Sequence, residues 1–281
     1  MPFLSISSET VAVLTLAAYA AVAVGVIYRQ ARDCPDGWQV WVLHLIARSY
    51  APWAFAQRID RRTLQPSTGG ALVLANHRGP VDPLFIFAAN SFRRDGLKVR
   101  IVEFMTASEY CELKGPLGWI VRTMRVIPVD RDGGDMEAAK EALKRLKKGR
   151  IVGVFPEGRL NTGEGLMAGN PGIAWLALRG GVPVYPIFIE NAPRAGGGMV
   201  KPFYTFQKVR IHYGEAIDLS HFGRMRPTPE NLQMVTRYLM EHLAKLGNTF
   251  VQPCETRLPP INSVKKPDTL PLDESALSRA G

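Results

Sequence analysis

The chain has 281 residues, of which 46% are hydrophobic and 21% are charged, so it holds enough apolar material for a sizeable core. Gly and Pro show no regular period, and Cys34, Cys111 and Cys254 form no C-x-x-C pair. Collagen-like and low-complexity proteins are therefore excluded, and neither a disulfide scaffold nor a zinc–thiolate site is indicated. The formal net charge of +10 points to an anionic partner: a nucleic acid, a lipid surface or a phosphorylated substrate.

An uncharged apolar segment runs from Val11 to Tyr28. Its length falls at the lower end of the range for a transmembrane helix, and the alternatives are a cleaved signal peptide and a buried helix. The residues before it include Glu9 and no Lys or Arg, which is the wrong charge for a signal peptide. Arg29 and Arg32 follow directly, so the positive-inside rule places the rest of the chain in the cytoplasm. We expect a membrane anchor here, either spanning or half-inserted.

Residues 38–56 predict a second, amphipathic helix. Trp38, Trp41 and Leu45 recur at helical spacing and arginines follow the segment, which suits a helix lying in a bilayer interface. A helix packed against a protein core is an equal alternative. In either case we expect Pro52 to break or kink the helix. With the preceding segment, this stretch predicts a membrane-anchoring helical region over residues 1–66.

Short apolar runs alternate with helical patterns beyond this region. Such alternation is typical of an α/β fold, and we expect a largely parallel mixed sheet flanked by helices over residues 67–250. Residues 251–281 are polar and contain several prolines, which predicts a disordered tail. The predicted strands are residues 71–75, 99–104, 125–129, 151–155, 183–189 and 209–213, and the predicted helices are residues 135–148, 171–179 and 229–246.

Polar turns follow two of these strands, at the strand ends where ligands gather in open α/β sheets. The first is NHRGPVD, residues 76–82, and the second is PEGRLN, residues 156–161. His77 can accept a proton near neutral pH once its tautomer is fixed, and Asp82 can fix it if the intervening Gly-Pro turns the chain. In the alternative, Asp82 only caps a helix that begins at Pro83.

These turns resemble sequence blocks of the glycerolipid acyltransferases, the enzymes that acylate glycerol-phosphate lipids. NHRGPVD is similar to their H-x-x-x-x-D block, and FPEGRLN (residues 155–161) resembles their F-P-E-G-T-R-S block. GPLGWIVRTMRVIPVDR (residues 115–131) resembles their second block, and VPVYP (residues 182–186) their short fourth block. The four blocks occur in the family's order, within residues 70–215. The resemblance therefore implies an acyltransferase domain over residues 67–250.

The resemblance also implies a mechanism. His77 would take the proton from a lipid hydroxyl, which attacks the thioester of acyl-CoA or acyl carrier protein. Asp82 would hold the imidazole and stabilise its charged form, as the acid does in a Ser-His-Asp triad. No enzyme nucleophile is apparent in the sequence, and the family implies neither a metal nor a bound cofactor.

The remaining site residues carry over from the second and third blocks. The resemblance implies that Arg131 and Arg159 bind the acceptor phosphate through charge-assisted hydrogen bonds. Glu157 is expected to hold an arginine or to contact the glycerol backbone, and amides near Gly158 to steady the oxyanion. The third block departs from the family's pattern, because Arg159 replaces the usual Thr and Leu160 the usual Arg.

The leading expectation is a membrane-bound enzyme that acylates 1-acyl-sn-glycerol 3-phosphate to phosphatidic acid, with its catalytic domain on the cytoplasmic face. Alternatives are another acceptor (glycerol 3-phosphate, another lysophospholipid or an ornithine lipid) and a non-catalytic lipid-binding protein. No nucleic-acid-binding motif accompanies the positive charge, so a nucleic acid is not expected. The surplus basic residues predict either a solvated face or a surface on anionic lipid. They are Arg93, Arg94, Lys98, Arg100, Lys140, Lys144, Arg145, Lys147, Lys148 and Arg150.

Overall fold

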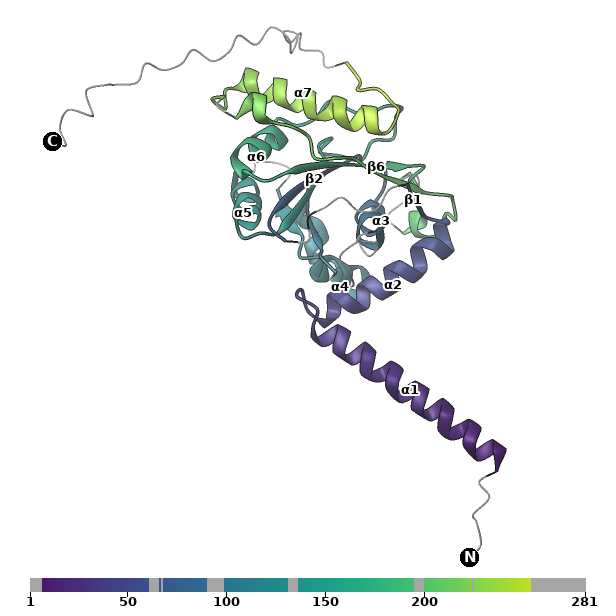
Figure 1. Ribbon diagram of the computed structural model, residues 1–281. Helices are drawn as coiled ribbons and strands as arrows, with labels where there is room; N and C mark the ends of the chain where they lie inside the picture. Colours follow the sequence, from purple (N-terminus) through teal and green to yellow (C-terminus); the bar gives the residue numbers. More distant parts are fainter. Residues whose placement is uncertain are drawn as a thin grey trace, which may run out of the picture.

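A seven-stranded sheet forms the centre of the molecule (Figure 1). The computed structural model describes residues 7–60, 66, 68–89, 99–130, 136–194, 200–223 and 225–253. The strand order is β1-β7-β6-β2-β5-β3-β4, and every neighbouring pair is parallel except β6 and β7. The strands are β1 (Arg58–Ile59), β2 (Ala71–Ala75), β3 (Val102–Ala107), β4 (Ile127–Val129), β5 (Ile151–Val154), β6 (Val184–Glu190) and β7 (Arg210–Tyr213). The predicted fold class, a largely parallel mixed sheet with flanking helices, is confirmed.

Helices cover both faces of this sheet. On one face lie α2 (Trp38–Phe55), α3 (Asp82–Ala89) and α4 (Gly115–Thr123); on the other lie α5 (Met136–Lys147), α6 (Gly172–Gly180) and α7 (Pro229–Leu246). Short 3-10 turns, η2 (Ser108–Glu112), η3 (Lys201–Tyr204) and η4 (Ser220–Phe222), connect the larger elements. Because both faces are covered, all five residues of β2 are buried, and their side chains alternate between the two cores.

The predicted strands all occur; β2 has the predicted ends, and the ends of the others are shifted. The largest shift is at β3, which begins at Val102 although the apolar run starts at Val99. Val99 and Ile101 are nonetheless buried, so the hydrophobic pattern correctly reported burial and only the pairing ladder begins later. Helix α4 and the short strand β1 were not predicted. Pro52 does not break α2, which continues to Phe55, so of the two expected effects of this proline only a kink stays a prediction.

Helix α1 (Ser8–Arg32) projects away from the sheet and its helical layers (Figure 1). The side chain of Ser7 caps its first turn by accepting a hydrogen bond from the backbone N–H of Thr10. No residue of α1 is buried, although most of its side chains are apolar. Among the described residues, α1 is the one helix long and apolar enough to cross a membrane, judged by length and composition.

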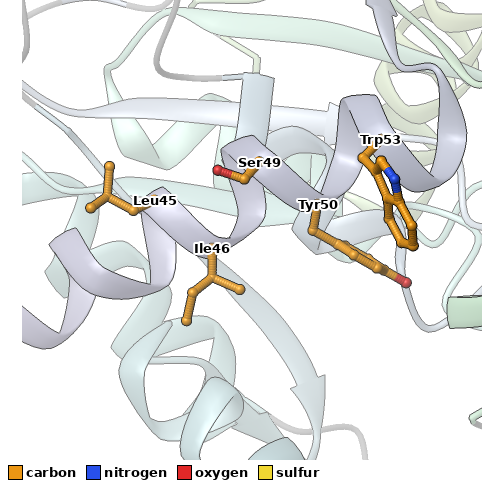
Figure 2. A pocket seen from close by; sticks show the side chains of 5 residues that line it. All are labelled: Leu45, Ile46, Ser49, Tyr50 and Trp53. Atoms are coloured by element: carbon orange, nitrogen blue, oxygen red, sulfur yellow. The ribbon is translucent and has the colours of Figure 1, made fainter.

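Helix α2 packs on the core with one face and exposes the other. Its inner face includes Leu43, Ala47 and Phe55, which are buried in the core with α3. Its outer face exposes Trp38, Leu45, Ile46 and Trp53. Figure 2 shows the outer face, where Leu45, Ile46, Ser49, Tyr50 and Trp53 line an open hollow of about 540 Å³. The helix is therefore a core element whose other side presents apolar surface to its surroundings.

A cluster of charged residues lies at the amino ends of β3 and β5. Glu103 accepts hydrogen bonds from Arg145 (3.0 Å) and Arg150 (2.7 Å), and Asp36 pairs with Arg125 (3.2 Å) and Arg150 (2.6 Å). Both carboxylates are buried. Asp36 stands just before α2, so the cluster joins the start of this helix to the sheet. Two of the predicted surface cations, Arg145 and Arg150, are thus ion-paired here, whereas Arg93, Arg94 and Lys98 lie outside the described residues.

Candidate active site

The two polar turns lie side by side at the carboxyl edge of the sheet. β2 and β5 are adjacent and parallel, with Leu72 opposite Val152, so the turns that follow them start at the same level. His77 and Asp82 come from the turn after β2, and Glu157 from the turn after β5. The structure thereby brings together three of the six predicted site residues.

The imidazole of His77 is hydrogen-bonded to the carboxylate of Asp82. Nδ1 lies 2.9 Å from Oδ2 of Asp82, and the ring stacks on Phe155 with a centroid distance of 4.0 Å. The Asp82 side chain is fully buried, while 20% of the His77 side chain is exposed. A carboxylate on Nδ1 favours the tautomer with its proton there, which leaves Nε2 as the proton acceptor. The geometry is that of a general base with its orienting acid.

Asp82 also organises the turn that carries His77. Its Oδ2 accepts hydrogen bonds from the backbone N–H groups of Arg78 (2.6 Å) and Gly79 (2.8 Å). Asp82 is the first residue of α3, yet these bonds run backwards to the turn, so capping its own helix does not account for its side chain. A Cβ at Gly79 would meet the carbonyl oxygen of Pro193 at 2.2 Å, which requires glycine at this position.

Glu157 fixes the backbone of His77 from the neighbouring turn. Its Oε1 accepts the N–H of His77 (2.9 Å), and its Oε2 accepts the N–H of Met167 (3.0 Å) and the side-chain amide of Asn161. The backbone N–H of Asn161 donates to the carbonyl of His77 (2.8 Å). Both peptide groups of His77 are therefore held by the turn after β5. The sequence had indicated an arginine or the glycerol backbone as the partner of Glu157, whereas its carboxylate contacts this chain's own groups.

Arg78 provides a second connection between the two turns, one that the sequence reasoning missed. Its guanidinium donates to the carbonyls of Asn161 (3.2 Å), Gly163 and Gly165 (2.7 Å). Burial lowers the pKa of Arg78 and nearby Arg194 acts in the same direction, while Glu157 and Asp82 oppose the shift. The available signal was an arginine directly beside the histidine, but only the fold shows which carbonyls it reaches.

Asn76 is another residue that the sequence reasoning missed. Its side chain is buried and bridges to β6, donating to the carbonyl of Ile189 (3.0 Å) and accepting from the N–H of the same residue (2.7 Å). These two bonds continue the pairing of β2 and β6 beyond the last residue of β2. The start of the His77 turn is thereby fixed to the sheet.

Gly158 and Arg159 lie at the exposed rim of the site. Gly158 adopts a left-handed backbone conformation with φ of 68°, and its N–H donates to the carbonyl of Phe155 (3.0 Å). This amide is therefore engaged within the turn instead of pointing at a substrate. Arg159 borders a hollow of about 370 Å³ that Asn170 and Gln252 also line. Arg131, the other predicted phosphate ligand, lies outside the described residues.

Fold and site together define an α/β enzyme with a histidine–aspartate pair as its candidate acid–base centre. A family model described as Acyltransferase matches residues 57–190, which include both turns. The chain is 26% identical over 187 residues to a 1-acyl-sn-glycerol-3-phosphate acyltransferase of Bacillus subtilis, covering 66% of this chain and 86% of that protein. It is 29% identical over 178 residues to a protein of the same name from Borreliella burgdorferi, covering 61% and 65% of the two chains.

The fold has a counterpart among solved structures. The crystal structure of the 1-acyl-sn-glycerophosphate acyltransferase PlsC from Thermotoga maritima matches 81% of this chain and 89% of that one, with a TM-score of 0.55 and 20% sequence identity. These comparisons support membership of the glycerolipid acyltransferase family and an acyltransferase activity. The family resemblance found in the sequence is confirmed.

Proposed function

We propose that this protein transfers an acyl chain from acyl-CoA or acyl carrier protein to 1-acyl-sn-glycerol 3-phosphate and so forms phosphatidic acid for phospholipid synthesis. The observation that carries the proposal is the His77–Asp82 pair, with Nδ1 bound to the carboxylate and the ring partly exposed. The names of the two related proteins support 1-acyl-sn-glycerol 3-phosphate as the acceptor.

The proposed chemistry is direct acyl transfer. Nε2 of His77 removes the proton from the free hydroxyl of the acceptor as its oxygen attacks the thioester carbonyl carbon. The tetrahedral intermediate collapses when the carbon–sulfur bond breaks, and the imidazolium returns the proton to the departing thiolate. Asp82 keeps the ring oriented and stabilises its positive charge during the transfer. Glu157 acts on the backbone of His77, so its proposed role is to keep the ring in place.

The acceptor's phosphate needs cationic partners. We assign this role to Arg131 and Arg159, because a guanidinium can bind two phosphate oxygens at once. The N–H of Gly158 donates to a carbonyl of its own turn. An oxyanion role for this N–H therefore requires the turn to rearrange when substrate binds. The acidic headgroup and the excess of basic residues are electrostatically complementary.

We also propose that α1 anchors the enzyme in the membrane with the catalytic domain on the cytoplasmic side. The support is the exposed apolar length of α1 and the arginines at its carboxyl end, Arg29 and Arg32. Cations outside the site are proposed to face anionic lipids.

A labelled acyl-transfer assay tests the proposed reaction. The full-length protein, the variant His77→Ala and the control His221→Ala would each receive 1-acyl-sn-glycerol 3-phosphate with acyl-CoA and, separately, with acyl carrier protein. His221 is an exposed histidine in η4, away from the two turns. We expect phosphatidic acid from wild type and from His221→Ala, and a loss of roughly 10²–10⁴-fold for His77→Ala. Equal rates for all three proteins would refute His77 as the base.

A second acceptor remains a specific alternative because Leu160 replaces the arginine that the family usually carries in its third block. The candidates are glycerol 3-phosphate, another lysophospholipid and an ornithine lipid. A panel of these acceptors with one labelled donor separates them. A kcat/KM for another acceptor above that for 1-acyl-sn-glycerol 3-phosphate would reassign the substrate and leave the mechanism unchanged.

A further inference from the structure

A loop that contains Tyr204 and Phe206 packs against the carboxyl end of α2, although it comes much later in the chain. The hydroxyl of Tyr50 donates a hydrogen bond to the carbonyl of Phe203, and the ring of Trp53 meets Phe206 edge-to-face at a centroid distance of 5.6 Å. The described part of this loop is residues 200–208, which contain η3 and precede β7. Because β7 begins opposite the end of β6, the loop lies at the same edge of the sheet as His77.

The loop and α1 stand at opposite ends of α2. The start of α2 is held near the amino edge of the sheet through Asp36 and Arg150, and α1 joins the molecule there. The end of α2 meets the loop at the carboxyl edge, where the N–H of Val209 donates to the carbonyl of Phe55 (3.0 Å). At 1.5 Å per residue, the 18 residues of α2 separate these two points by about 27 Å.

The aromatic side chains at this end are largely unburied. Trp53 is 74% exposed, Tyr204 is 67% exposed and Phe206 is 59% exposed. Phe206 also has a φ of 47°, a left-handed conformation that is unfavourable for a bulky residue. Both features are unfavourable in water. Transfer of the exposed rings into an environment that takes up aromatic side chains would offset them.

We propose that Trp53, Tyr204 and Phe206 form a second membrane contact, which enters the interfacial layer of an anionic bilayer. Tryptophan and tyrosine favour this layer because their rings are apolar and their edges are polar. The exposed Lys201 and Lys208 flank the rings and can meet acidic headgroups. The contact extends along the outer face of α2, whose hollow is apolar in its lining (Figure 2).

The second contact orients the enzyme on the bilayer. A domain held only by α1 can tilt about one point, whereas two points at the ends of α2 lay that helix along the surface. The catalytic edge then stays next to the layer that contains the lipid acceptor. This inference rests on the proposed membrane attachment and on no particular acceptor.

A fluorescent probe reports directly on the loop. In full-length protein with Cys34, Cys111 and Cys254 replaced by serine, a single cysteine would be placed by Phe206→Cys or, as a control, by Met136→Cys. Met136 is 52% exposed and begins α5 on the other face of the sheet. Each cysteine would carry an environment-sensitive dye, and the protein would be reconstituted in phosphatidylcholine–phosphatidylglycerol vesicles with and without a nitroxide-labelled lipid.

We expect the dye at 206 to shift its emission to the blue and to be quenched by the nitroxide lipid, while the dye at 136 shows neither change. Equal behaviour of the two dyes would overturn the proposal. A blue shift at 206 without lipid quenching would also overturn it, because the loop would then be covered by protein. The readout needs no turnover, so an inactive protein whose 206 dye is quenched would refute the proposed reaction and leave the membrane contact standing.

The consequence for activity is tested separately. The double variant Tyr204→Ser/Phe206→Ser should lose several-fold in rate on an acceptor embedded in vesicles and keep its rate on a short-chain, water-soluble acceptor. Met136→Ser serves as the control and should change neither rate. An equal loss on both acceptors would indicate damage to the fold and count against the proposed orientation.

Discussion

Buried carboxylates lie at both edges of the sheet, but they are neutralised by different partners. At the amino edge, Asp36 and Glu103 are paired with arginines. At the carboxyl edge, Asp82 binds a histidine ring and two backbone N–H groups. An arginine keeps its charge at every physiological pH, whereas a histidine can take up and release a proton. Of these two arrangements, only the carboxyl-edge pair can therefore take up and release a proton.

The largest effect that this comparison predicts is on catalysis at the carboxyl edge. Asp82→Asn should lower kcat by about 10³–10⁴-fold, because an amide in place of the carboxylate favours the wrong tautomer of His77 and cannot stabilise the imidazolium. Steady-state rates with a labelled acyl donor measure this effect. The control is Asp218→Asn, an exposed aspartate that also accepts a backbone N–H, from Ser220. A similar loss in both variants would remove the distinction between the two carboxylates.

Substitutions at the amino edge should lower the stability of the protein and leave its catalytic rate unchanged. Glu103→Ala leaves the guanidiniums of Arg145 and Arg150 without one of their carboxylates, and breaking a buried ion pair of this kind costs about 3–5 kcal/mol. We expect a clearly lower thermal midpoint in detergent, with kcat for the molecules that remain folded close to that of wild type. If kcat fell by more than the folded fraction, the amino-edge cluster would have a part in catalysis.

His44 provides a pH-dependent test in the layer between α2 and α3. Burial, with a smaller contribution from Arg48, lowers the pKa of His44 from 6.5 to about 4. The unfolded chain takes up the proton below pH 6.5 while the native protein resists it, so stability is lost as the pH falls from 6.5 towards 4. By pH 5 the loss is about 2 kcal/mol. His44→Leu should remove this component, so the thermal midpoints of wild type and variant should diverge below pH 6.5. Parallel curves would contradict a buried neutral histidine.

The smallest predicted effect concerns the connection between the two catalytic turns. Arg78→Lys keeps the charge but loses the forked guanidinium that reaches three carbonyls, and we expect kcat to fall by about tenfold with little change in KM. A shift of the His77 ring would also change the pH profile of kcat. Arg179→Lys, an exposed arginine on α6, is the matched control. A change in KM alone would place Arg78 in substrate binding.

Much of the fold was predictable because its signals are local. The buried strands β2 and β5 appear as uninterrupted apolar runs, and α7 begins with the Thr228 cap and Pro229 that its sequence shows. The His77–Asp82 pair was also within reach, since the Gly-Pro between them indicates a turn. The resemblance to the family's sequence blocks then favoured a catalytic pair over a helix cap, a choice that the spacing alone left open.

The missed elements depend on distant contacts. Helix α4 begins with Gly115 and contains Gly118, both poor helix formers, and it forms where it packs on the core beside α2. Arg125 carried no local sign of its pairing with Asp36, 89 residues earlier in the chain. The contact between Glu157 and the N–H of His77 likewise joins residues 80 positions apart. Only the assembled sheet defines such pairs.

The separation of α1 from the sheet has a consequence for how this sequence can change. None of its side chains is buried in the protein, so substitutions there are restricted by apolarity and length rather than by shape. Helix α2, by contrast, must fit α3 on one side, and a change to its inner face alters the core beneath the active site. A chimera with an unrelated apolar helix in place of α1 should keep its catalytic fold, whereas exchange of α2 should not. Substitutions in α1 can thus alter the proposed membrane attachment while the catalytic fold stays the same.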